Sequence, residues 1–128
     1  MRILLIEDSR AVYDLLVREI RRCSFEVELV WMDTLAAARS EMIRNGYDAV
    51  LLDIGIPDAE RGNSINNLAE IIKLTGHPVV ILSGNEDPKE ITRAINAGAA
   101  AYLTKRLIPE CVLQVFITLY VAYLKNIV

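Results

Sequence analysis

The sequence predicts a doubly wound α/β domain, in which helices cover both faces of a parallel sheet. Three continuous apolar runs, at residues 3–6, 49–52 and 79–82, have the length and composition of strands that are buried on both faces. Segments of helical length separate these runs, so strands and helices alternate along the chain. The chain has 128 residues, 53% of them hydrophobic, which is enough for one domain with a sizeable core. We therefore expect residues 1–128 to form a single domain.

Five strands and five helices are expected in alternation. Two weaker strand candidates, residues 27–31 and 100–103, join the three apolar runs because they are rich in aromatic, β-branched or small apolar residues. Helices are expected at residues 9–23, 34–45, 64–74 and 88–97, and from Pro109 to about Lys125. Asp8 or Ser9 is expected to cap the first helix, and glycines that follow the next three helices are stop signals.

Composition excludes several classes of partner. The 17 acidic and 14 basic residues give a net charge of -3, which argues against binding to nucleic acid or to an anionic membrane. Only four consecutive apolar residues precede Glu7, too few for a signal peptide, and the most apolar part of the last helix is half a membrane span. Cys23 and Cys111 have neither metal-ligand spacing nor disulfide density. A cytoplasmic protein without a membrane segment is expected.

Polar side chains follow four of the five predicted strands. Glu7 and Asp8 follow the first strand, Asp53 the third, Ser83 the fourth and Lys105 the fifth. In a doubly wound sheet the functional groups gather beyond the carboxyl ends of the strands, so we expect these side chains to lie together. Three neighbouring carboxylates would repel one another unless a cation lay between them. Mg²⁺ is the natural candidate, because it prefers oxygen ligands and is held by carboxylates together with phosphate oxygens.

The same group of residues has the chemistry of a phosphoryl-transfer site. Lys105 supplies a mobile positive charge for a phosphoryl oxygen, and the Ser83 hydroxyl supplies a hydrogen bond to another. A carboxylate can act as the nucleophile, and Asp53 ends the central apolar run. A structural interpretation remains for each residue alone, since Asp8 could cap a helix and Asp53 could be a turn residue.

Four stretches in order, "LLIED", "VLLDIGIPD", "VVILSG" and "AGAAAYLTK", resemble the receiver domain of bacterial two-component response regulators, and the resemblance covers the whole chain. It implies a flavodoxin-like sheet with strand order 2-1-3-4-5. It also implies that Asp53 accepts a phosphoryl group from a sensor histidine kinase or a phosphotransfer protein. Asp8 and Asp53 would then bind Mg²⁺ directly, Glu7 through water, and Gly55 through its backbone carbonyl.

The resemblance implies roles for three further residues, and it implies a signalling function rather than a turnover enzyme. Lys105 would contact the phosphoryl group and Asp53, Ser83 would move to bind a phosphoryl oxygen, and Tyr102 would reorient with Ser83. The domain would be a switch that controls a partner or an output domain, with Mg²⁺-dependent self-phosphorylation and self-dephosphorylation as its only catalysis.

Two departures from the family pattern leave alternatives open. Arg106 stands where receiver domains commonly have proline, and Gly62 comes one residue later than usual after Asp53. A degenerate receiver that acts as a constitutive interaction module is therefore one alternative. An aspartate-nucleophile phosphohydrolase is another, although such enzymes usually have an acid two residues after the nucleophile, where this chain has Gly55.

The last predicted helix is apolar around most of its circumference. Before Lys125 its polar side chains are confined to one stripe, Glu110, Gln114 and Thr118. A helix on a sheet needs only one apolar face, so part of this surface has no obvious partner within the domain. We expect the helix to form an interface, either in a homodimer or with a downstream output domain. The alternative is that the fourth helix and the C-terminal residues cover it.

Overall fold

The computed structural model describes residues 1–56, 58 and 64–127, and all structural statements refer to these residues. Gly62 lies outside them. The elements are, in chain order, β1 (Arg2–Ile6), α1 (Arg10–Ile20), β2 (Glu28–Met32), α2 (Leu35–Arg44), β3 (Ala49–Asp53), α3 (Ser64–Thr75), β4 (Val79–Ser83), α4 (Pro88–Asn96), β5 (Ala101–Thr104), the 3₁₀ helix η1 (Lys105–Leu107) and α5 (Ile108–Asn126). All strand pairs are parallel, in the order β2-β1-β3-β4-β5. The predicted fold is confirmed.

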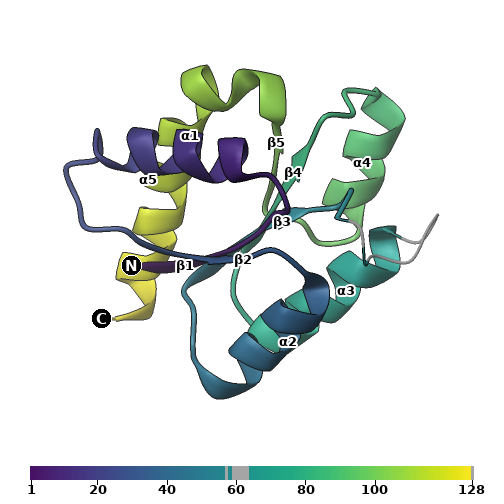
Figure 1. The fold of residues 1–128 in the computed structure, drawn as a ribbon, viewed down its shortest axis with the longest axis horizontal. Helices are drawn as coiled ribbons and strands as arrows, with labels where there is room; N and C mark the ends of the chain where they lie inside the picture. Colours follow the sequence, from purple (N-terminus) through teal and green to yellow (C-terminus); the bar gives the residue numbers. More distant parts are fainter. Residues whose placement is uncertain (57, 59–63, 128) are drawn as a thin grey trace.

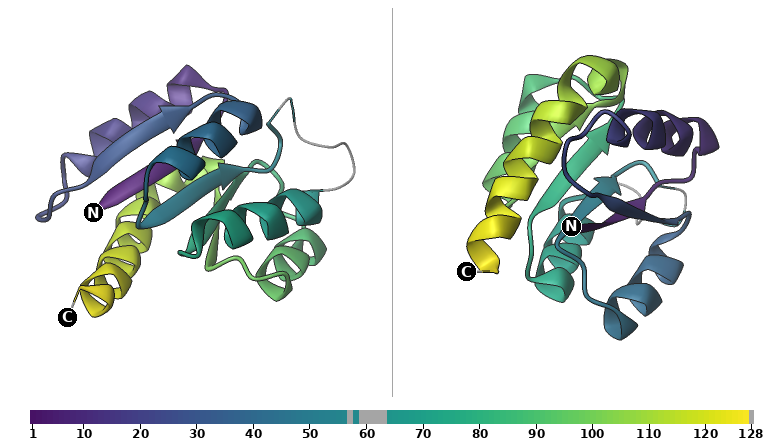
Figure 2. Two further views of the ribbon diagram at one scale, coloured as in Figure 1. Left: turned by 90° about the horizontal axis from the view of Figure 1, so that it is seen from below. Right: turned by 90° about the vertical axis from the view of Figure 1, so that its left-hand side faces the viewer.

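The sheet is the middle of three layers (Figure 1). Helices α1 and α5 cover one face, where Leu16 of α1 and Phe116 of α5 are completely buried against alternate residues of the central strands. Helices α2, α3 and α4 cover the other face, where Leu35 and Ile71 pack on the intervening strand residues. Figure 2 shows the sheet between these two groups of helices. The continuous apolar runs are explained, because both faces of β1, β3 and β4 are covered.

Two strands extend one residue further than their apolar runs. The β3–β4 pairing continues to Asp53, opposite Leu82, and the β4–β5 pairing continues to Ser83, opposite Thr104. A strand ladder is made by backbone groups, so it does not stop where the side chains become polar. Asp53 and Ser83 are therefore held by the sheet itself. The 3₁₀ helix η1, which begins at Lys105, was not predicted from the sequence.

One predicted side-chain cap and two of the three predicted stop glycines are confirmed, whereas α2 is followed by Asn45 in an extended conformation and Gly46 does not have a positive φ angle. Ser9, one of the two predicted caps, accepts a hydrogen bond from the Val12 amide, and α1 ends at Ile20 rather than Cys23. Gly76 and Gly98 have φ angles of 65° and 111°, which residues with a Cβ rarely adopt. These two glycines therefore stop α3 and α4 for a conformational reason.

Helix α5 is only partly covered. Val112, Phe116 and Leu119 are buried against the sheet, whereas Ile117 and Val121 are exposed. By length and composition alone the segment Lys105–Asn126 could span a membrane, a longer apolar segment than the half-span expected from the sequence. Tyr120 stacks on Phe25, in the connection between α1 and β2, with ring centroids 4.2 Å apart. This connection, rather than α4 or the C-terminal residues, covers that side of the helix.

Candidate functional site

Three carboxylates meet at the carboxyl edge of the sheet. Glu7 follows β1 and is completely buried, Asp8 beside it is exposed, and Asp53 at the end of β3 is 4% exposed. One oxygen from each of the three lies within 4.8 Å of the others. The predicted grouping is thus confirmed for the acids, and β1 and β3 position them because they are adjacent strands.

Lys105 lies between the two buried acids. Its Nζ donates to Glu7 Oε1 at 3.1 Å and lies 3.2 Å from Asp53 Oδ2. The other Asp53 oxygen, Oδ1, accepts a hydrogen bond of 2.9 Å from the Gly55 amide. The side chain of Asp53 is therefore held by two donors, one charged and one from the backbone. A Cβ at position 55 would lie 3.4 Å from Asp53 Oδ1, so this loop residue approaches the carboxylate closely.

The electrostatics of the site are set by burial. Burial, together with the charge of Asp53, raises the pKa of Glu7 to about 7, although Lys105 opposes this shift. Burial alone would lower the pKa of Lys105, but its hydrogen bond to Glu7 and the charges of both acids raise it. Lys105 is therefore positively charged at neutral pH, and one ammonium group faces two carboxyl groups.

The donor set fits a hard divalent cation. Glu7 Oε2 lies 3.1 Å from Lys105 Nζ, but it is buried and has no hydrogen-bond donor among the described residues. Buried carboxylate oxygens without a donor are costly, and a cation or its water would satisfy this one. Asp8 is exposed and offers a ligand from the solvent side. Clustered carboxylate oxygens are what Mg²⁺ and Mn²⁺ prefer.

Ser83 and Tyr102 are both tied to the loop between β4 and α4. Ser83 is 6% exposed, and its Oγ accepts a hydrogen bond of 3.0 Å from the Asn85 amide. The Tyr102 hydroxyl, on β5, donates to the Asn85 carbonyl at 2.7 Å. The two side chains that the sequence resemblance links therefore bind the same loop residue, Ser83 at its amide and Tyr102 at its carbonyl.

A second contact that holds the β4–α4 loop was not predicted from the sequence. Arg106 donates to both carboxylate oxygens of Glu86, at 3.2 and 2.9 Å, and so connects η1 to the β4–α4 loop. The residue that replaces the family's usual proline is thus engaged in a bidentate ion pair. All described peptide bonds are trans. The sequence does contain acidic residues in "NED" and basic residues in "TKR", which could have suggested an ion pair. Which of these residues pair depends on the fold.

Two other residues near the site have roles that the sequence did not indicate. Asp58 accepts hydrogen bonds from the Leu35 and Ala36 amides at 2.8 and 3.0 Å, so it caps α2 from the loop that follows β3. The Trp31 indole donates to the backbone carbonyl of Glu7 and stacks on Tyr13. The Trp31 fluorescence is therefore a natural reporter of the acidic site.

This geometry has a counterpart in a known family. Residues 3–116 match the family model of the response regulator receiver domain. The chain belongs to this family. Receiver domains are phosphoacceptor switches of two-component systems, which are signalling domains rather than turnover enzymes, and this membership disfavours the phosphohydrolase alternative.

Curated relatives include longer regulators. The chain is 32% identical to the response regulator protein PmrA of Pseudomonas aeruginosa, over 82% of this chain and 46% of that protein. It is 28% identical to the swarming motility regulation protein RssB of Serratia marcescens, over 90% of this chain and 51% of that protein. The chain thus spans about half the length of these bacterial relatives.

Solved structures agree with the fold. A CheY-like receiver domain protein from Methanospirillum hungatei is 26% identical with a TM-score of 0.73, and the match covers 92% of each chain. The Mn²⁺-bound form of the response regulator Rcp1 is 26% identical with a TM-score of 0.68, over 80% of this chain and 79% of that one. A response regulator from Thermotoga maritima, 19% identical over 92% of this chain and 95% of that one, has a TM-score of 0.79 and supports the fold alone.

Proposed function

We propose that this receiver domain is phosphorylated on Asp53. The observation that carries the proposal is the environment of this carboxylate, which ends the central strand and has Lys105 at 3.2 Å and Glu7 and Asp8 beside it. An aspartate buried only for structure would not be placed among two further acids, because like charges raise the free energy of the site. This arrangement suits a nucleophile that accepts a phosphoryl group, because the neighbouring acids can bind the cation that the transfer requires.

The reaction is a phosphoryl transfer with a covalent product. An Asp53 carboxylate oxygen attacks phosphorus in a phosphohistidine of a sensor histidine kinase or phosphotransfer protein, and the P–N bond breaks as the P–O bond forms. With acetyl phosphate, acetate leaves instead and the phosphorylation needs no other protein. Attack by water on phosphorus later breaks the P–O bond to Asp53, which releases inorganic phosphate and returns the free carboxylate.

The residues around Asp53 would hold Mg²⁺ and the transferred group. Asp8 and Asp53 would bind the ion directly, Glu7 through water, and Gly55 through its carbonyl. The bound ion would neutralise negative charge on the phosphoryl oxygens. Lys105, which now bridges Glu7 and Asp53, would bind one phosphoryl oxygen, and Ser83 would bind another.

The change of conformation would start at the β4–α4 loop. When the Ser83 hydroxyl turns toward the phosphoryl group, its hydrogen bond with the Asn85 amide breaks. The Tyr102 hydroxyl is bonded to the Asn85 carbonyl, so movement of this loop moves the tyrosine as well. The contacts of one residue would therefore couple phosphorylation to the surface formed by α4 and β5.

The domain boundaries, the cellular location and the partners are also part of the proposal. We assign the receiver domain to all of residues 1–128, because α5 continues as one helix beyond the matched residues. The phosphoryl donors proposed above and the spacing of the two cysteines support a cytoplasmic location. An output domain or partner protein would read its state, and the net charge of -3 argues against nucleic acid or an anionic membrane as the partner of this domain.

Incubation with acetyl phosphate and Mg²⁺, followed by intact-mass measurement, tests the proposal. The wild type should gain the mass of one phosphoryl group, and Asp53→Asn should gain none. Asp33→Asn is the matched control, because Asp33 is an exposed acid that follows β2 at the same edge of the sheet. Undiminished phosphorylation of Asp53→Asn would disprove the assignment. Unmodified wild type would disprove self-phosphorylation, and a histidine-kinase donor would then be tried.

A further inference from the structure

We propose that Trp31 is a positioning residue for the acidic site, because its indole holds the peptide group between Glu7 and Asp8. The inference rests on the proposed binding of Mg²⁺ by Asp8 and adds a residue that acts through it. The indole nitrogen of Trp31 donates a hydrogen bond to the backbone carbonyl of Glu7. Trp31 lies near the end of β2 and Glu7 directly after β1, so the contact joins the ends of two paired strands.

Glu7 and Asp8 are consecutive residues whose side chains reach the same acidic cluster. Consecutive residues of a strand point to opposite faces of the sheet. Nevertheless, one oxygen of Glu7 and one of Asp8 lie within 4.8 Å of each other and of an oxygen of Asp53. The chain leaves the extended conformation after β1 and bends at Asp8. The orientation of the peptide group between the two acids therefore decides where the Asp8 carboxylate lies.

The backbone of Glu7 is held by two hydrogen bonds. Its amide donates to the Met32 carbonyl at 3.1 Å, which extends the β1–β2 ladder beyond the last paired residues. Its carbonyl accepts from the Trp31 indole, so a side chain takes the place of a further strand partner. The Glu7 carbonyl and the Asp8 amide belong to one planar group, and the indole restricts rotation of that group. Trp31 thereby limits the directions in which the Asp8 side chain can point.

The Trp31 indole is itself held in place. Its ring stacks on the Tyr13 ring of α1, with centroids 4.7 Å apart and planes inclined by 13°. The Tyr13 amide donates to the Ser9 carbonyl at 3.2 Å, in the first turn of the helix that follows the acids. An indole with a fixed ring directs its N–H group at one acceptor. Residues that lie behind a metal ligand orient the ligand in this way.

A purely structural explanation exists for the same hydrogen bond. Trp31 is partly buried on the face of the sheet that α1 and α5 cover, and a buried indole N–H needs an acceptor. If that were its only role, loss of the N–H group would change the stability of the fold and leave Mg²⁺ binding unchanged. If Trp31 acts through Asp8, the loss weakens Mg²⁺ binding only while the Asp8 carboxylate is present. The two explanations therefore predict different results.

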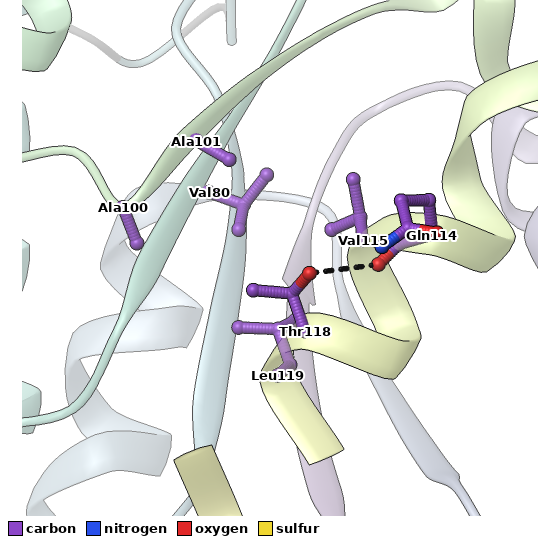
Figure 3. A pocket seen from close by; sticks show the side chains of 7 residues that line it. All are labelled: Val80, Ala100, Ala101, Gln114, Val115, Thr118 and Leu119. Atoms are coloured by element: carbon purple, nitrogen blue, oxygen red, sulfur yellow. Dashed lines mark hydrogen bonds between the residues drawn. The ribbon is translucent and has the colours of Figure 1, made fainter. Parts of the chain in front are cut away.

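Trp31→Phe tests the role, because it keeps an aromatic ring to stack on Tyr13 and removes the N–H donor. The affinity for Mg²⁺, measured by titration calorimetry, should fall at least about threefold, as expected for the loss of one neutral hydrogen bond. Thr118→Val is the matched control. Thr118 also donates one side-chain hydrogen bond to a backbone carbonyl, that of Gln114 at 3.0 Å, beside the hollow between α5 and the strands β4 and β5 (Figure 3). This variant should bind Mg²⁺ as the wild type does.

A double variant shows whether Trp31 acts through Asp8. Asp8→Ala alone should weaken Mg²⁺ binding more than Trp31→Phe does. Adding Trp31→Phe to Asp8→Ala should then cause no further loss, because the ligand that the indole positions is gone. A further loss of the same size in the double variant, or an unchanged affinity in Trp31→Phe alone, would overturn the proposal.

A measurement in EDTA tests the positioning without the ion. The Ser9 amide donates to Glu7 Oε1 at 3.2 Å, so its hydrogen bond spans the peptide group that the indole holds. Hydrogen exchange of this amide should be at least about threefold faster in Trp31→Phe than in the wild type, and unchanged in Thr118→Val. Tyr13→Leu, which keeps the indole but removes its stacking partner, should show a smaller change in the same direction and replaces Trp31→Phe if that variant does not fold.

The two measurements distinguish failure of this inference from failure of the ion site. A wild type that binds no Mg²⁺, together with faster Ser9 exchange in Trp31→Phe, would refute the ion site and support the positioning of the peptide group by Trp31. Wild-type Ser9 exchange in Trp31→Phe would overturn the role of Trp31 whether or not Mg²⁺ binds.

Discussion

At the scale of single residues, Glu7 shows how burial makes the charge of a carboxyl group sensitive to pH near neutrality. Its charged form is favoured by Lys105, which bridges it to Asp53, and is disfavoured by the charge of Asp53. Burial and Asp53 prevail, and the pKa rises to about 7. The same side chain offers an oxygen to the acidic cluster. The metal-free protein therefore exchanges a proton at this position near neutral pH.

The first prediction concerns the pH dependence of stability without metal. Because the pKa of Glu7 is higher in the folded protein than the ordinary 4.5, the folded state binds the proton more tightly. The stabilisation is fully present below pH 4.5 and is lost as the pH rises to about 7. In EDTA, wild type should lose on the order of 3 kcal/mol between these limits relative to Glu7→Gln, by urea unfolding. Glu26→Gln, an exposed control, should behave as wild type. Identical slopes for wild type and Glu7→Gln would contradict the assignment.

At the scale of elements, side chains from loops hold the sheet edge and the helices together. Asp58 reaches from the loop after β3 to the first amides of α2, and Arg106 reaches from η1 to Glu86 in the β4–α4 loop. Neither contact belongs to the hydrophobic layers. Each joins segments that lie about 20 residues apart in the chain.

The second prediction concerns the cap on α2. Hydrogen bonds from the Leu35 and Ala36 amides outweigh the effect of burial and lower the pKa of Asp58. Asp58→Ala should reduce the free energy of unfolding by about 1 kcal/mol, the usual worth of a helix cap, and Asp58→Asn by less. Thermal unfolding can be compared with Asp14→Ala, an exposed acid on α1. A larger loss for Asp14→Ala than for Asp58→Ala would argue against the capping role.

The third prediction concerns the Arg106–Glu86 ion pair. Both side chains are largely exposed, so the pair should contribute at most about 1 kcal/mol to stability. Its main effect should be local, because Arg106→Ala frees the loop that binds Ser83 and Tyr102. Amide hydrogen exchange at Asn85 and Asp87 should become faster in Arg106→Ala and in Glu86→Gln, with no further increase in the double variant. Arg93→Ala, which breaks an exposed ion pair within α4, is the control. Additive effects of the two changes would disprove the coupling.

At the scale of the whole molecule, α5 has two apolar faces in different surroundings. Its inner face completes the layer that α1 begins, and Phe116 on that face is completely buried. Its outer face is apolar and uncovered by the described chain. The core is therefore closed on one side of this helix, and the other side is exposed.

The fourth prediction separates the two faces by stability. Phe116→Ala should lower the free energy of unfolding by about 3–5 kcal/mol, since it leaves a cavity in the core. Val121→Ala should change it by less than about 0.5 kcal/mol when measured at concentrations where the protein is monomeric. Chemical denaturation of both variants measures the difference. A large loss in Val121→Ala would mean that the outer face packs within the monomer.

The sequence by itself determined the alternation of strands and helices and the candidate site. Continuous apolar runs required a sheet covered on both faces, and a parallel sheet brings Glu7, Asp53 and Lys105 to one edge by geometry alone. The grouping of the acids was predictable because it depends only on which residue ends each strand. The chemical roles of all the site residues remain predictions: Asp53, Asp8, Glu7, Gly55, Ser83, Tyr102 and Lys105.

Only the tertiary structure decided the contacts between segments that are distant in the chain. Asp58 caps a helix 22 residues earlier, Arg106 pairs with Glu86, and Tyr120 stacks on Phe25 rather than facing outward. A charged or aromatic side chain has many possible partners of similar chemistry in the sequence. Which of them it contacts depends on which elements lie side by side in the fold. Burial also set the pKa of Glu7, because desolvation depends on everything packed around the carboxyl group and not on its neighbours in the sequence.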